Sequence, residues 1–87
     1  MNTRKRICPK NYSLSEYPEF SDRLKLVMKL RNYTSGKLAA RIFTSRATIS
    51  MYLSGRRMPT ISILCLISKE LEVSTDFLLG LSEIVYV

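Results

Sequence analysis

The 87-residue chain contains no histidine and no tryptophan, and it has only two cysteines. Two cysteines without histidine do not complete the usual four-ligand zinc site, and they are too few for the disulfide framework of a small secreted domain. The sequence also lacks a Ser–His–Asp set, a glycine-rich phosphate loop and paired carboxylates in apolar surroundings. We therefore expect neither catalysis nor a metal or other cofactor.

Long hydrophobic runs are also missing. No apolar stretch approaches the roughly 20 residues that span a bilayer, and the basic N-terminus lacks the apolar segment of a signal peptide. These absences predict a cytoplasmic protein without a membrane partner. Cys65 lies in the apolar run ISILCLISKEL, where we expect it to be a small core residue.

Acidic residues are absent from the middle of the chain. Between Asp22 and Glu70 there is no Asp or Glu, although this interval holds ten of the 14 Lys and Arg residues. The other four bases lie in an acid-free N-terminal stretch, and the C-terminal third is acidic. Solubility alone would explain the net charge of +7, but its segregation favours a polyanionic partner such as nucleic acid.

Apolar residues recur at helical spacing in five short segments, which predicts an all-α domain over residues 18–80. We predict helices at about 18–31, 46–54 and 60–71, the second of them capped by Ser45, together with a short helix capped by Thr34 and another capped by Ser74. A flexible basic arm, 1–17, and an apolar tail, 81–87, are expected to flank this domain. The residues expected to face the core are Phe20, Leu24, Val27, Leu30, Leu38, Ala39, Ile42, Ile49, Tyr52, Leu53, Ile61, Leu64, Ile67, Leu71, Phe77 and Leu78.

The stretch TSRATISMYLSGRRMP, residues 44–59, contains three arginines and five Ser or Thr residues but no acid. On a helix, Ile49 and Tyr52 share one side, whereas Ala47, Ser50 and Met51 share the opposite side. The apolar side suits the core. The opposite side carries small or flexible side chains, which leave room for a closely approaching partner.

A short helix, a tight turn and a second capped helix form the layout of a helix-turn-helix. From Phe20 to Gly80 the chain resembles the Cro/C1-type (XRE-family) helix-turn-helix domain of phage and bacterial repressors. The matching pieces are FSDRLKLVMKLR, LAARI, SRATISMYLSG, GRRMPT and LISKELEVSTDFLLG. The resemblance implies a five-helix, lambda-repressor-like domain with its helix-turn-helix at about 35–54. It also implies a nucleoid-associated regulator, most often a repressor, that reads double-stranded DNA sequence-specifically without a cofactor.

The resemblance further implies that the helix at about 46–54 enters a major groove. Arg46 is placed to bind a guanine, and Ala47, Ser50 and Met51 are placed to contact other bases. Phosphate contacts are expected from Ser35, Lys37, Ser45, Thr48, Ser54, Arg56, Arg57 and Thr60. Minor-groove contacts are expected from Arg4, Lys5 and Arg6 of the arm. The alternatives are ordinary solvated positions for Arg46, Ser50, Arg56 and Arg57, a surface or dimer contact for Met51, a helix cap alone for Ser45, and plain disorder for the arm.

The chain departs from the family pattern at four positions. Phe43 and Glu72 stand where the family usually has glycine, Ser35 replaces a common glutamine, and Leu53 replaces a frequent acidic residue. The glycine position in the turn at Phe43 often has a positive φ, and a positive φ is strained for a bulky side chain. We therefore expect the turn at Phe43 to be reshaped.

The apolar C-terminal end is the candidate seam of a two-fold dimer on a palindromic operator. Its residues are Leu79, Leu81, Ile84, Val85, Tyr86 and Val87. Alternatively, the tail folds back on its own chain or packs on a further domain of a longer repressor.

Two other functions make different predictions about the surface. A protein-interaction module would carry acids or large apolar residues on the outer face of the 46–54 helix, and an RNA-binding protein would expose aromatics.

Overall fold

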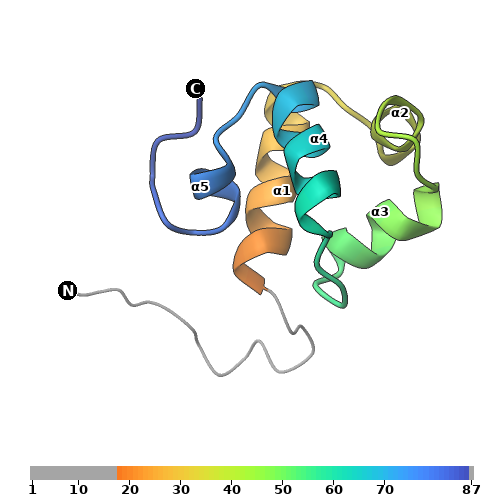
Figure 1. The fold of residues 1–87 in the computed structure, drawn as a ribbon, viewed down its shortest axis with the longest axis horizontal. Helices are drawn as coiled ribbons and strands as arrows, with labels where there is room; N and C mark the ends of the chain where they lie inside the picture. Colours follow the sequence, from red (N-terminus) through yellow and green to blue (C-terminus); the bar gives the residue numbers. More distant parts are fainter. Residues whose placement is uncertain (1–17, 87) are drawn as a thin grey trace.

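The computed structural model describes residues 18–86, which form five α-helices and no strand (Figure 1). The helices are α1 (Pro18–Leu30), α2 (Ser35–Arg41), α3 (Arg46–Leu53), α4 (Ile61–Leu71) and α5 (Thr75–Leu78). The five-helix fold is confirmed, and the three helices predicted with bounds match them within one residue. Within the described part no helix is long and apolar enough to cross a membrane. The predicted arm and Val87 lie outside the described residues.

Hydroxyl side chains determine where four of the helices begin. Thr34, Ser45, Thr60 and Ser74 occupy the N-cap positions of α2, α3, α4 and α5. Each side-chain oxygen accepts a hydrogen bond from the backbone amide three residues later, at 3.1–3.3 Å. Such a cap satisfies an amide that has no partner inside the helix and stabilises the fold by about 1 kcal/mol. The capping predictions at Thr34, Ser45 and Ser74 are confirmed.

The core lies where α1 packs against α3 on one side and α5 on the other, with α2 packed on α3 and α4. In Figure 1 α3 and α5 accordingly lie on opposite sides of α1. The buried apolar residues are Phe20, Leu24, Val27, Met28, Leu38, Ala39, Ile42, Ile49, Tyr52, Ile67, Leu71, Val73, Phe77 and Leu78. Because Tyr52 and Phe77 are both buried, neither offers the exposed aromatic platform that single-stranded RNA binding uses.

Three predicted core residues lie at the surface instead. Leu30 is 49% exposed and Ile61 is 82% exposed, and the Cys65 side chain is also exposed. Leu30 is the last residue of α1 and Ile61 is the first residue of α4, so both stand at a helix end. Cys65 lies about 200° around α4 from the buried Ile67 and therefore faces outward. The periodicity identified the buried face correctly but not the point along each helix where burial ends.

The turn between α2 and α3 is not reshaped, so that expectation was wrong. Phe43 adopts a φ of 61°, the left-handed conformation that favours glycine, and its side chain is 87% exposed. The turn closes through a 2.9 Å hydrogen bond from the Thr44 amide to the Ala39 carbonyl. Glu72 behaves alike after α4, with a φ of 56°. Both residues adopt a strained backbone at positions where the family pattern that the sequence resembles usually has glycine.

The C-terminal tail folds back onto the domain. The Ser74 amide donates to the Val85 carbonyl at 2.7 Å, and Val73 and Tyr86 form a single antiparallel bridge. Val85 packs against the core, and the Arg31 guanidinium lies 4.7 Å from the centroid of the Tyr86 ring. The fold-back alternative is therefore correct for Val85, which is not part of an exposed seam.

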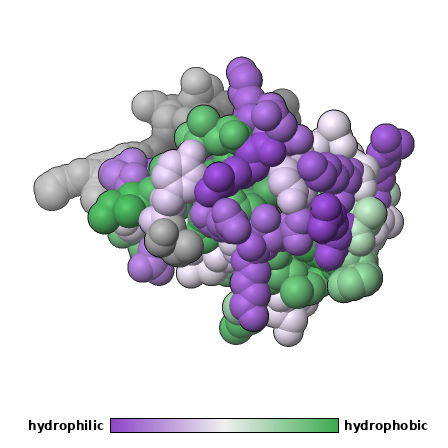
Figure 2. All heavy atoms as spheres, turned by 90° about the horizontal axis from the view of Figure 1, so that it is seen from above, coloured by the Kyte–Doolittle hydropathy of each residue, from purple (hydrophilic) through white to green (hydrophobic). Residues whose placement is uncertain are grey.

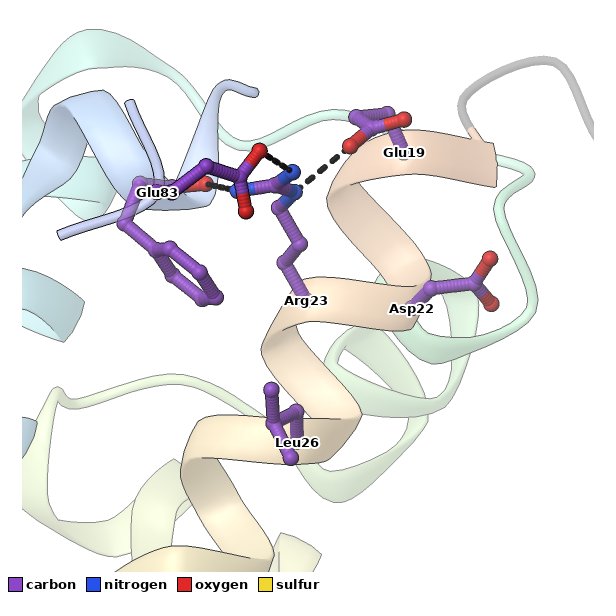
Figure 3. A pocket seen from close by; sticks show the side chains of 6 residues that line it. Glu19, Asp22, Arg23, Leu26 and Glu83 are labelled. Carbon is purple, nitrogen blue, oxygen red and sulfur yellow. Dashed lines mark hydrogen bonds and ion pairs between the residues drawn. The ribbon is translucent and has the colours of Figure 1, made fainter. Parts of the chain in front are cut away.

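Arg23 of α1 holds the other part of this tail. Its guanidinium lies between the carboxylates of Glu19 and Glu83, at 2.5 and 3.0 Å (Figure 3). It also donates to the carbonyl oxygens of Phe77 and Ser82, at 3.1 and 2.9 Å. Burial opposes the charge of Arg23, but the hydrogen bonds to Glu83 and Glu19 outweigh burial and raise the pKa of the guanidinium. One side chain thus joins α1, α5 and the tail.

Candidate nucleic-acid interface

The helix α3 turns one side to the core and the other to solvent. Ile49 and Tyr52 are buried, and the Tyr52 ring meets the Phe20 ring of α1 edge-on with 6.3 Å between centroids. The exposed side carries the four predicted base-contact residues, Arg46, Ala47, Ser50 and Met51. The core contacts therefore fix the orientation of α3 and leave these four side chains available to a partner.

Hydroxyl groups frame both ends of α3. At its start the Ser45 Oγ accepts from the Thr48 amide at 3.1 Å and also lies 2.9 Å from the Thr48 Oγ1. At its end the Ser54 Oγ donates to the Met51 carbonyl at 3.0 Å. The predicted phosphate-contact residues Ser45, Thr48 and Ser54 thus form hydrogen bonds within α3 and at its ends. Ser45 and Ser54 are nevertheless exposed and face solvent beside the base-contact side chains.

The arginines of residues 18–86 fall into two groups. Those with a carboxylate oxygen within 4 Å are Arg23, Arg31 and Arg41. Arg46, Arg56 and Arg57 are exposed, and their side chains have no hydrogen bond or ion pair with any described residue. The arginines of this second group all belong to α3 or to the loop that follows it. Their charge is therefore available to an anion from outside the domain.

The beginning of α2 adjoins this basic region and is tied to α4. Tyr33 donates from its hydroxyl to the Glu70 Oε2 at 2.5 Å, and the Arg41 Nε lies 3.7 Å from the same oxygen. The hydrogen bond to Glu70 and then burial raise the pKa of Tyr33. Lys37, a predicted phosphate-contact residue, places its Nζ 4.4 Å from the centroid of the Tyr33 ring. No sequence spacing indicates this cluster, because Tyr33 and Glu70 are 37 residues apart.

The remaining predicted site residues lie as follows. Ser35 is half-buried at the first position of α2, and Thr60 is exposed at the cap of α4. Because α2 packs on α3, the start of α2 and the start of α3 belong to one surface. Gly36 of α2 lies directly against the guanidinium of Arg46. The predicted minor-groove residues, Arg4, Lys5 and Arg6, are outside the described residues.

Apolar side chains also reach the surface, among them several at the C-terminal end. In the view of Figure 2 hydrophilic side chains gather across the middle of the molecule, and apolar ones appear at the margins. Among the tail residues, Leu81 is 74% exposed and Ile84 is 71% exposed. Leu79 and Tyr86 are partly exposed beside them. The C-terminal end therefore presents apolar surface although the tail itself is fastened to the domain.

Comparison with known proteins agrees with this geometry. Residues 24–78 match the helix-turn-helix family model HTH_3. The restriction-modification controller protein C.AhdI from Aeromonas hydrophila is 17% identical with a TM-score of 0.64, and the match covers 69% of this chain and 91% of that chain. An HTH_3 family transcriptional regulator from Vibrio cholerae is 22% identical with a TM-score of 0.64, and the match covers 82% of this chain but only 39% of that chain. At these identities the two structures show a shared fold. No curated protein sequence matches significantly.

Proposed function

We propose a mode of action for this protein, which belongs to the helix-turn-helix family HTH_3 and is a DNA-binding regulator of transcription. In the proposed mode α3 enters the major groove of an operator, and occupancy of the operator represses a nearby gene. One observation carries the proposal: the side of α3 opposite the buried Ile49 and Tyr52 is exposed and carries small or flexible side chains. The protein would act on bacterial or phage DNA in the cytoplasm, by occupancy and without catalysis.

The base-contact residues divide by the chemistry of their side chains. The planar fork of Arg46 fits the O6 and N7 acceptors of guanine, which is the commonest specific contact in the major groove. Ala47 and Met51 suit the methyl group of thymine, and the Ser50 hydroxyl can donate to a base or accept from one. These four side chains would discriminate between sequences, because each contacts a base edge rather than the backbone.

The phosphate-contact residues would hold α3 in register. Arg56 and Arg57 supply charge without an internal partner, and Lys37 supplies charge at the start of α2. The hydroxyl residues proposed to assist them are Ser35, Ser45, Thr48, Ser54 and Thr60. Contacts of this kind position the protein on any duplex, so they strengthen binding without reading sequence.

The test begins with selection of bound duplexes from a random pool at a stated salt concentration. Arg46→Ala should then lose about 1–3 kcal/mol on the selected duplex and relax its preference at one base pair. Arg56→Ala should weaken selected and unrelated duplexes alike and lower the salt slope by about one. Lys69→Ala removes an exposed charge from the last turn of α4 and is the control that should change neither quantity.

Two results would contradict the proposal. If the pool yields no enriched sequence, the protein does not read DNA sequence. If Arg46→Ala and Arg56→Ala lower affinity uniformly across duplexes, Arg46 does not contact a base.

We further propose that the protein binds a palindromic operator as a homodimer joined through its C-terminal end. A single helix-turn-helix reads only a few base pairs, and pairing on two half-sites extends the site. Leu81 and Ile84 are the most exposed apolar residues of the tail, with Leu79 and Tyr86 beside them. Such a small seam lies at the transient end of protein interfaces, so we expect weak association that DNA reinforces.

Sedimentation of the free protein and of its complex with the selected duplex tests this assembly. Replacing Leu81 and Ile84 with serine should convert a 2:1 protein–duplex complex into a 1:1 complex. Both side chains are mostly exposed, so the fold should be preserved. Deleting the tail is a poorer test, because Glu83 and Ser82 bind Arg23 and their loss would disturb the domain. A 1:1 complex of the unsubstituted protein on a palindromic duplex would contradict the proposed dimer.

A further inference from the structure

The side chain of Arg46 rests on the first turn of α2, at a glycine. A Cβ built on Gly36 would lie 3.2 Å from the Arg46 Nε, 3.3 Å from the Nη2 and 3.5 Å from the Cζ. The guanidinium therefore lies next to the place where any other residue would carry its side chain. The two contacts to nitrogen are tighter than most real Cβ contacts, so a methyl group here would push the guanidinium away by a few tenths of an ångström.

The backbone gives no reason for a glycine at this position. Gly55 and Gly80 have positive φ values of 77° and 81°, whereas Gly36 is an ordinary residue of α2 and has no positive φ. Among residues other than proline, glycine is the poorest helix former, because it loses the most backbone freedom on folding. Gly36 thus weakens a seven-residue helix, and the three described atoms nearest to where its Cβ would stand all belong to Arg46.

We infer that Gly36 determines specificity by orienting Arg46. The Arg46 side chain has no hydrogen bond or ion pair within residues 18–86, and its guanidinium lies beside the first turn of α2. A bidentate contact to guanine needs the guanidinium plane in one orientation, whereas a phosphate accepts an arginine from many directions. Gly36 therefore affects the contact of Arg46 to guanine and would not affect a contact to phosphate. The inference rests on the proposed reading of a base by Arg46.

Gly36→Ala separates stability from recognition, because the two should change in opposite directions. Alanine improves α2, so Tm should rise. The displaced Arg46 should bind the selected duplex about threefold to tenfold more weakly, a coupling of the size found between residues in contact. Affinity for unrelated duplexes should not change. Ala40→Gly, at an exposed position of the same helix, is the matched control that should lower Tm without altering the preference between duplexes.

A double-mutant cycle completes the test. In an Arg46→Ala background, Gly36→Ala should still raise Tm but should no longer change affinity for the selected duplex. An equal loss of affinity in both backgrounds, or an unchanged preference in the single variant, would overturn the role of Gly36 while leaving base reading by Arg46 intact. If Arg46→Ala alone leaves the preference between duplexes unchanged, base reading itself fails, and the inference fails with it.

Discussion

Replacing Phe43 with glycine should make the free domain more stable. Phe43 has a φ of 61° in the turn between α2 and α3, and its side chain is 87% exposed. In the left-handed conformation the Cβ crowds the following carbonyl oxygen, at a cost of roughly 1–2 kcal/mol for an L-amino acid. Glycine removes this crowding, and little packing is lost because the ring contacts little of the domain.

The expected gain is smaller than the strain itself. Glycine gives the unfolded chain more conformations, which lowers the free energy of unfolding by roughly 0.4–1 kcal/mol. The difference leaves a net stabilisation of about 0–1.6 kcal/mol, centred near 0.8 kcal/mol. For a domain of this size the central value raises Tm by about 3–6 °C.

Thermal unfolding of three variants distinguishes strain from the effect of the ring. Phe43→Ala removes the ring but keeps a Cβ, so it should not be stabilised. Asn32→Gly is the second control, because Asn32 has a φ of 60° and asparagine tolerates this conformation, so its Tm should hardly change. Equal stabilisation by Phe43→Ala would assign the effect to the exposed ring. A lower Tm for Phe43→Gly would show that the phenyl group stabilises the turn, and either result refutes the reasoning.

Three further predictions concern the core, a cap and a titrating pair. Ile67→Ala should lower the free energy of unfolding, measured in urea, by about 2–5 kcal/mol. Ile61→Ala, at an 82% exposed position, should lower it by less than about 0.5 kcal/mol. Equal losses would contradict the described burial. Ser45→Ala should lower the free energy of unfolding by about 0.5–2 kcal/mol, because it leaves an amide at the start of α3 unpaired. The folded state raises the pKa of Tyr33 above its usual 10.0, so the stability from this group is present below pH 10 and is lost as pH rises through the raised pKa. Unfolding titrations should show a steeper loss in that alkaline range for the unsubstituted protein than for Tyr33→Phe.

Helix positions could be predicted from the sequence because their signals act over a few residues. Ser45 and Ser74 bind amides only three residues away, and the apolar spacing of α3 repeats within two turns. Such local patterns hold whatever the rest of the fold does. They led to helix bounds within one residue and to the exposed side of α3. They do not say how far a neighbouring helix extends, which is why the exposed Ile61 was expected in the core.

The contacts that shape the site could not be predicted in the same way. Tyr33 meets Glu70 across 37 residues, and Arg23 meets Ser82 across 59 residues. Each pair forms only because two helices, or a helix and the tail, pack at a particular angle and at a particular position along the helix axis. Periodicity fixes which side of a helix is buried but not its crossing angle or its shift along the axis. The packing of Gly36 against Arg46 depends on the same geometry.

The turn at Phe43 shows how tertiary packing overrides a local preference. The residue's own preference favours a different backbone by roughly 1–2 kcal/mol. The helices on either side of the turn are held by Leu38, Ala39, Ile42 and Ile49, all buried, and burying one large aliphatic side chain is worth roughly 1.5–3 kcal/mol. Moving the turn would disturb several of these contacts at once. The strain at one residue is the smaller cost, and the same reasoning applies to Glu72 after α4.

The acid-free middle of the chain explains why free arginines collect around α3. An arginine in this interval finds a carboxylate only where the fold brings in an acid from outside it. Glu19 meets Arg23 one turn away within α1, and packing brings further acids from the end of α4 and from the tail to Arg23, Arg31 and Arg41. No described acid reaches Arg46, Arg56 or Arg57. A charge without an internal partner contributes nothing to folding through ion pairing, so the arginines on α3 and its loop are the ones whose charge an external polyanion can use in full.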